Sequence, residues 1–121
     1  MTSATLQGLA GLYGLCAVGL GAFAAHGLKA RLDDYALDIM NTATQYAMVH
    51  AVALLALSCA PAASQVRLAG WGFALGVALF SGSLYALALS GQRWLGAITP
   101  LGGLFLLAAW GYLLFSAFRN P

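Results

Sequence analysis

The two histidines, His26 and His50, are the side chains of this sequence with the widest range of chemistry. Paired imidazoles can ligate haem iron, and an imidazole can carry protons near neutral pH. His26 stands at the end of one long apolar segment, whereas His50 lies within the next, which begins at Met40. On helices that rise about 1.5 Å per residue the rings differ in depth by about 15 Å, so one iron atom could hardly bind both. No Asp or Glu follows in the apolar segments to continue a proton path.

Other polar side chains gather in the same half of the predicted helices as His26. Tyr46 lies one helical turn from His50 and Thr42 one turn further, so these three share one side of a helix. Polar side chains inside a membrane face protein or water rather than lipid. They form either interhelical hydrogen bonds or a cavity, open to one side, that holds a ligand. This predicted polar cluster comprises His26, Asn41, Thr42, Gln45, Tyr46, His50, Ser81, Ser83, Tyr85 and Thr99.

The sequence contains no pattern typical of catalysis or metal binding. Its acidic residues, Asp33, Asp34 and Asp38, all lie in one charged connection, so the apolar segments hold no carboxylate pair for acid–base chemistry. Cys16 and Cys59 stand alone, without the spacing of a zinc site or a disulfide framework. The net charge of +2 is not clustered, which argues against nucleic acid as a partner. We therefore expect no catalytic residue, no metal, no cofactor and no enzymatic activity.

The composition places the chain in a membrane. Of the 121 residues, 62% are hydrophobic and only 7% are charged, whereas a soluble domain is usually about 25% charged. Four windows without Asp, Glu, Lys or Arg exceed the roughly 20 residues that cross a bilayer as a helix. They predict spans at about residues 6–25, 40–60, 68–89 and 97–118 in a single membrane domain, residues 1–121. A signal peptide has basic residues before its apolar segment. No basic residue precedes the first span, so we expect this span to be retained in the protein.

The connection between the first two spans, residues 27–38, holds five of the eight charged residues. Its apolar residues recur at helical spacing, which predicts an amphipathic segment on the membrane surface. The apolar face of this segment would comprise Leu28, Leu32, Tyr35 and Ile39.

Residues around this connection also predict how the flanking helices end. Asp33 or Asp34 is expected to cap the second helix, with Asp38 in its first turn. His26 is expected to end the first helix, followed by Gly27 in the left-handed conformation that closes a helix. In this interpretation the His26 ring hydrogen-bonds neighbouring helix ends and holds the charged connection in place.

Short connections near residues 61–65 and 90–93 favour antiparallel neighbours. The simplest fold is therefore an all-α, up-down-up-down four-helix bundle. Small residues recur at helical spacing and would let helix backbones approach closely in lipid. They are Ala17, Gly21 and Ala25 on the first helix, and Gly72, Gly76, Gly82, Ala86 and Ser90 on the third.

Four ordered motifs resemble a known family: GAFAAHGL at residues 21–28, TATQYAMVH at 42–50, FSGSLY at 80–85 and TPLGG at 99–103. Together they are similar to the domain of unknown function 423 family of small four-span membrane proteins, which includes animal transmembrane protein 256. The resemblance covers nearly the whole chain. It implies an integral membrane protein with both termini in the cytoplasm, and it implies no established activity.

The charges by themselves do not orient the chain. Lys29, Arg31 and Arg93 on one side nearly balance Arg67, Arg119 and the amino terminus on the other. We expect a multi-pass protein of the bacterial cell inner membrane.

Two functions fit these observations. The first is a non-catalytic accessory subunit or self-associating scaffold, because the small-residue stripes favour helix association and little of the chain lies outside the membrane. Its partners would be the lipid bilayer and a homo-oligomer or larger membrane complex. The alternative is a binding or transport module for a small amphipathic ligand, such as a lipid or quinone, in a one-sided polar cavity.

Overall fold

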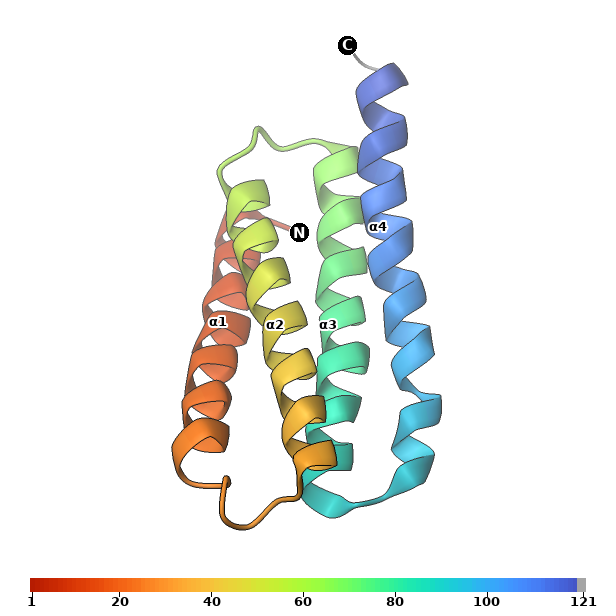
Figure 1. Cartoon of the computed structure of the whole chain (residues 1–121). Helices are drawn as coiled ribbons and strands as arrows, with labels where there is room; N and C mark the ends of the chain where they lie inside the picture. Colours follow the sequence, from red (N-terminus) through yellow and green to blue (C-terminus); the bar gives the residue numbers. More distant parts are fainter. Residues whose placement is uncertain (120–121) are drawn as a thin grey trace.

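The computed structural model describes residues 1–119 and is helical apart from its connections over that range. Consecutive long helices run in opposite directions, so α1 begins and α4 ends at the same end of the molecule (Figure 1). The prediction of an all-α chain is confirmed. The elements are α1 (Ser3–His26), α2 (Asp34–Ser58), α3 (Ser64–Ser90), the 3-10 helix η1 (Arg93–Ala97) and α4 (Thr99–Arg119).

Local side-chain chemistry sets several helix ends. Asp33 caps α2, as predicted, because its Oδ1 accepts a hydrogen bond from the Ala36 backbone N–H at 2.9 Å. The helix therefore starts at Asp34, which puts Asp38 in its second turn and not, as predicted, in its first. α3 ends at Ser90 and is closed by Gly91, whose φ of 74° is a left-handed conformation that glycine adopts without strain.

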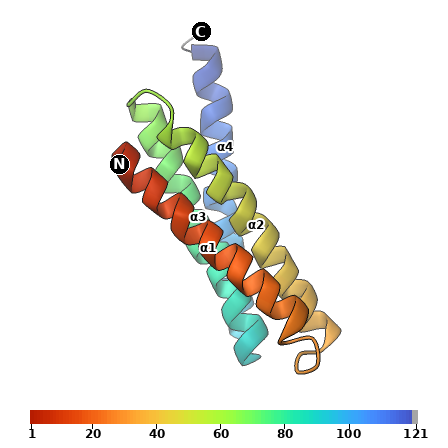
Figure 2. The ribbon, with the colours of Figure 1, turned by 90° about the vertical axis from the view of Figure 1, so that its left-hand side faces the viewer.

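α3 is the central helix of the packing. It packs against α2 and against α4, while α1 packs mainly on α2. In the described part of the chain α1 and α4 make no contact, and Figure 2 shows α4 on the far side of the molecule from α1. α3 accordingly buries more residues than any other helix.

Glycines bring α3 and α4 close together. A Cβ on Gly76 would lie 2.5 Å from Cδ2 of Leu106, and a Cβ on Gly102 would overlap the backbone nitrogen of Phe80. Gly72 continues the same line of contact. The Gly72–Gly76 pair therefore does mark a close helix contact, but with α4 of the same chain.

The other small residues of α1 and α3 differ in how deeply they are buried. On α1, Ala17 is fully buried, and a Cβ on Gly21 would lie 3.0 Å from Cγ2 of Thr44, so both positions admit α2 closely. Ala25 is exposed, and the buried residue beside it is Ala24. The small residues in the second half of α3 remain exposed: Gly82, Ala86 and Ser90.

Three helical stretches are long and apolar enough to cross a bilayer: α1, α3 and the run Arg93–Arg119, which comprises η1 and α4. α2 is long enough, at 25 residues, but it is not among them. The reason is its polar first half, which includes Asn41, Thr42 and Gln45. Of the four predicted spans, the second, at residues 40–60, is therefore not supported by hydropathy alone.

The predicted amphipathic segment is not a separate surface helix. Residues 27–32 form turns, and the helix that follows is α2 itself. Leu28 is buried, and Leu32 and Ile39 pack against the same small cluster, so they cover the end of the helices. Tyr35, the fourth member of the predicted apolar face, is 62% exposed.

Candidate functional site

His50 is held between two hydrogen bonds in the middle of the molecule. Its Nδ1 donates to the backbone oxygen of Tyr46 on α2, 2.7 Å away. Its Nε2 accepts from the indole Nε1–H of Trp110 on α4, 3.0 Å away. These partners require a neutral imidazole with its proton on Nδ1, because the carbonyl can only accept and the indole can only donate. Both ring nitrogens of this buried side chain are therefore satisfied within the protein.

Aromatic rings surround this histidine. The ring centroid of His50 lies 5.4 Å from that of Phe73 and 5.9 Å from that of Trp110. Tyr46 lies against Phe80, with ring centroids 4.4 Å apart. The pairs fall in the distance range of favourable aromatic contacts, so they hold the imidazole in one place.

A groove of about 270 Å³ opens beside His50, between α2 and α4. Tyr46 and His50 form its α2 wall, Gly103 and Trp110 belong to its α4 wall, and Phe80 of α3 lines it between them. Tyr46 and Trp110 are 43% and 46% exposed, so both lie at the surface of the groove. Apart from His50 and the edges of these two rings, the lining is apolar, which suits an apolar ligand with at most one or two polar groups.

Three further hydrogen bonds use four of the eight remaining residues of the predicted cluster. Ser81 Oγ donates to the Ala43 oxygen at 2.8 Å, which joins α3 to α2. The hydroxyls of Thr44 and Tyr85 are 2.7 Å apart across the same two helices. The hydroxyls of Ser83 and Thr99 are 2.6 Å apart and join α3 to the start of α4. These side chains hold the helices together and do not converge on one cavity.

The other predicted cluster members stand apart from this network. Asn41, Thr42 and Gln45 are exposed on α2, and within residues 1–119 their side chains form no hydrogen bond. His26 is exposed as well. The structure therefore divides the ten predicted residues into four that bond between helices, two in a groove wall, three on an open polar face of α2, and His26 at the end of α1.

His26 ends α1, as predicted, but its predicted role is wrong. Its exposed ring has no hydrogen-bond partner in the described part of the chain. Gly27 has a φ of −87°, so it is not left-handed. A Cβ there would lie 2.6 Å from Cε1 of Phe23, so a side chain at this position would have to displace the Phe23 ring. The backbone N–H groups of Gly27 and Leu28 close the helix on the Phe23 oxygen instead.

Three residues with clear roles were missing from the predicted cluster. Trp110 holds His50, Thr44 bonds Tyr85, and the Tyr13 hydroxyl donates to the Ala74 oxygen at 2.6 Å. Counting residues along each helix could have predicted Trp110 as a partner. It lies near the middle of α4, and His50 lies deep within α2, so the two are at similar depth. Tyr13 had no such signal, since its partner is a backbone carbonyl that every residue carries.

The chain resembles other membrane proteins over almost its whole length. The family model described as "Protein of unknown function (DUF423)" matches residues 20–103. A UPF0382 membrane protein of Staphylococcus haemolyticus is 42% identical over 92% of this chain and 93% of its own length. The UPF0382 membrane protein YwdK of Bacillus subtilis is 40% identical, over 92% and 94%. A UPF0382 membrane protein of Schizosaccharomyces pombe is also 40% identical, over 91% and 98%. No solved structure matches the chain.

Proposed function

Since this chain belongs to the DUF423 family of membrane proteins of unknown function, we propose that it is a non-catalytic membrane scaffold or accessory subunit that associates with a second copy of itself. The observation that carries the proposal is the outward face of α2. Asp38, Thr42 and Gln45 follow one another there at spacings of four and three residues, which is one face of a helix. Val49 and Val52 continue that face towards the other end of α2, and both are more than half exposed.

A polar helix face exposed to lipid is costly. Polar side chains within a span face protein or water, yet no other helix of this chain bonds Thr42 or Gln45 among the described residues. A second copy supplies what is missing, because the Gln45 amide both donates and accepts and two such faces can pair across a twofold axis. In lipid, interhelical polar bonds of this kind are worth about 0.6 kcal/mol each on average.

The proposal requires α2 to cross the membrane as a fourth span in an up-down-up-down bundle, as predicted from the sequence. Its 25 residues correspond to about 37 Å of helix, which exceeds the roughly 30 Å hydrocarbon core. An even number of spans places both termini on one side, and we assign them to the cytoplasmic face of the bacterial inner membrane. Reporter domains that work only in the cytoplasm should be active at both termini. Termini on opposite faces would mean three spans and would remove α2 from the bilayer.

The test of association is native mass spectrometry of the protein extracted in a mild detergent. The parent should appear as a dimer or higher oligomer, and the double variant Thr42→Val, Gln45→Leu should shift it to monomer. Val52→Leu, on the same face but in its apolar half, is the matched control and should leave the oligomer intact. A parent that is strictly monomeric and free of partners contradicts the proposal.

A second function is favoured by the groove beside His50. Its aromatic and apolar lining, with one hydrogen-bonded imidazole, fits the ring or chain of a lipid-soluble molecule such as a quinone or lipid. Gly103→Leu would fill this groove, since a Cβ there meets only Cδ2 of Phe80, at 3.9 Å. Lipid or quinone that co-purifies with the parent should be lost in Gly103→Leu and kept in Gly111→Leu, which changes an open position on α4. Equal ligand content in all three proteins would exclude a site in this groove.

A further inference from the structure

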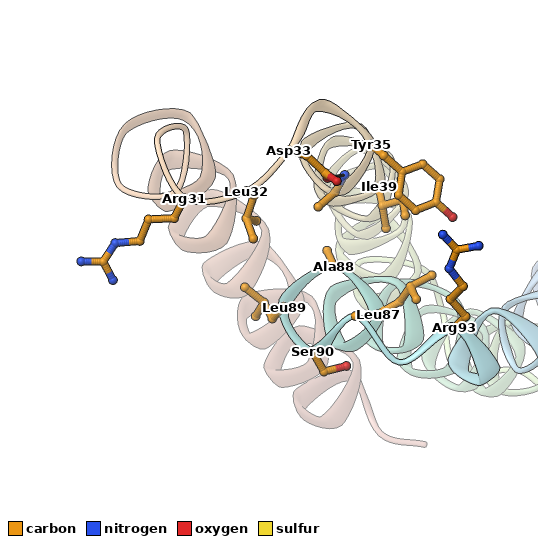
Figure 3. Close-up of a pocket in the computed structure, with 12 residues that line it drawn as sticks. Arg31, Leu32, Asp33, Tyr35, Ile39, Leu87, Ala88, Leu89, Ser90 and Arg93 are labelled. Atoms are coloured by element: carbon orange, nitrogen blue, oxygen red, sulfur yellow. Dashed lines mark hydrogen bonds between the residues drawn. The ribbon is translucent and has the colours of Figure 1, made fainter.

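A cavity lies at the end of the molecule that carries the charged connection. It measures about 500 Å³, within the roughly 300–1,000 Å³ typical of small-molecule sites. The connection after α1 and the first turns of α2 form one side of it, and the end of α3 with the start of η1 forms the other (Figure 3). Because α1 ends at His26 and α3 at Ser90, the cavity lies where the spans leave the bilayer.

The cavity combines an apolar floor with a basic rim. The floor comprises Leu32 from the connection and Leu87 and Ala88 from the end of α3 (Figure 3). Arg31 and Arg93 stand on opposite rims: the Arg93 guanidinium lies near the ring of Tyr35, whereas Arg31 points outward. A ligand that suits both parts has an anionic head and an apolar body.

The charges of the lining favour an anion. Its one carboxylate belongs to Asp33, and that group already accepts the Ala36 N–H to cap α2. Within residues 1–119, neither Arg31 nor Arg93 forms an ion pair, so no carboxylate neutralises either positive charge. Guanidinium groups bind phosphate oxygens with charge-assisted and often bidentate hydrogen bonds.

We propose that this cavity binds the phosphate headgroup of an anionic phospholipid, with the acyl chains running along the apolar side towards the bilayer. Arg93 holds the phosphate, and the Tyr35 hydroxyl offers a further donor beside it. Arg31, whose side chain points outward, adds positive charge at the opposite rim. Tyrosine and arginine are residues that anchor at the headgroup level, and a guanidinium group matches the geometry of phosphate oxygens. The site shares no residue with the groove beside His50 or with the set of residues that defines the outward face of α2, so it goes beyond the proposed function.

The experiment measures lipid binding to the full-length protein by native mass spectrometry, with phosphatidylglycerol or phosphatidylcholine added to the same detergent. The parent should bind phosphatidylglycerol more tightly than phosphatidylcholine. The double variant Arg31→Gln, Arg93→Gln should bind phosphatidylglycerol roughly tenfold to thirtyfold more weakly, since each basic residue at the surface contributes to the attraction. The matched control is Arg67→Gln, an exposed arginine at the opposite end of the molecule, which should bind like the parent.

Both the comparison of lipids and the comparison of variants have an outcome that overturns the proposal. Equal binding of the two lipids by the parent, or unchanged phosphatidylglycerol binding by the double variant, would exclude this site. Displacement of the lipid by excess inorganic phosphate would identify a free-anion site and reject the lipid assignment. Leu87→Glu is a second variant that leaves both arginines in place and puts a carboxylate on the cavity floor. It should also weaken phosphatidylglycerol binding, and full binding by it would overturn the proposal.

Discussion

α3 is held on its two sides by different physical means. On the α4 side, Gly76 and Gly102 let the two helices touch closely, so the contact is mainly van der Waals packing, with one hydrogen bond between Ser83 and Thr99 at the start of α4. On the α2 side, Ser81 bonds a backbone carbonyl of α2, and the hydroxyls of Thr44 and Tyr85 bond each other. We call the α3–α4 contact at Gly72, Gly76 and Gly102 the glycine seam. We call the α2–α3 bonds of Ser81, Thr44 and Tyr85 the hydroxyl seam.

The difference teaches which contacts can tolerate change. Packing at the glycine seam depends on the absence of side-chain atoms, so an added methyl group must separate the helices or distort one of them. A hydrogen bond at the hydroxyl seam can be lost while the helices stay in place, and membrane proteins recover only about 0.6 kcal/mol from each on average. We therefore expect the glycine seam to be the less tolerant of the two.

The largest effect is expected at Gly102, in the glycine seam. A Cβ there would overlap the Phe80 nitrogen and lie 2.8 Å from the Gly76 oxygen, and neither backbone atom can rotate away. Gly102→Ala should lower the free energy of unfolding by about 3 kcal/mol, at the upper end of overpacking effects. The measurement is reversible unfolding in mixed detergent micelles, followed by circular dichroism.

The matched control for that substitution is Gly82→Ala. A Cβ at Gly82 meets nothing within 4 Å, and alanine favours the helix over glycine by about 1 kcal/mol. The control should therefore be as stable as the parent or slightly more so. Equal losses in the two variants would show that the helices do not meet closely at Gly102.

A smaller effect is expected for Trp110→Phe, which tests the one hydrogen bond described here that reaches from α4 to α2 past α3. The change leaves Nε2 of His50 without its donor, and an unsatisfied buried polar group costs about 1–3 kcal/mol. Trp71→Phe is the control, since Trp71 is 52% exposed on α3. If both variants unfold alike, the bond between His50 and Trp110 contributes nothing measurable.

A still smaller effect is expected from a double-mutant cycle at the hydroxyl seam. Thr44→Val and Tyr85→Phe each remove one partner of the 2.7 Å bond and keep nearly the same shape. Their coupling energy should be about 0.6 kcal/mol, and at most about 1.7 kcal/mol. A coupling as large as the loss at Gly102 would reverse the ranking of the two seams.

The smallest effect is expected at His26, which belongs to neither seam. Its ring is exposed and bonds no described residue, so His26→Ala should change the free energy of unfolding by less than about 0.5 kcal/mol. Hydrogen exchange of residues 27–33 should also match the parent. Faster exchange there together with a lower melting temperature would restore the role that the sequence first suggested for this histidine.

The sequence alone was sufficient to predict the helices and several of their ends. Charge-free windows predict long helices because backbone groups in lipid must bond within their own segment, and Asp33 caps α2 because its carboxylate bonds locally. The close contact of Gly72 and Gly76 was also readable, since helix spacing puts both on one face. These features depend on residues within a few turns of one another.

The partners of the polar side chains were decided only by the tertiary structure. Nothing local distinguishes Tyr85, which bonds Thr44, from Gln45, which bonds nothing described, because the difference is the rotation of each helix about its axis. Trp110 could join His50 only once α3 had brought α2 and α4 to matching depth. In the same way, Arg31 and Arg93 are 62 positions apart in the sequence and share a cavity only because the connections beside α2 and α3 fold to one end. Sequence spacing sets which face of a helix a residue occupies, whereas packing between helices decides what that face meets.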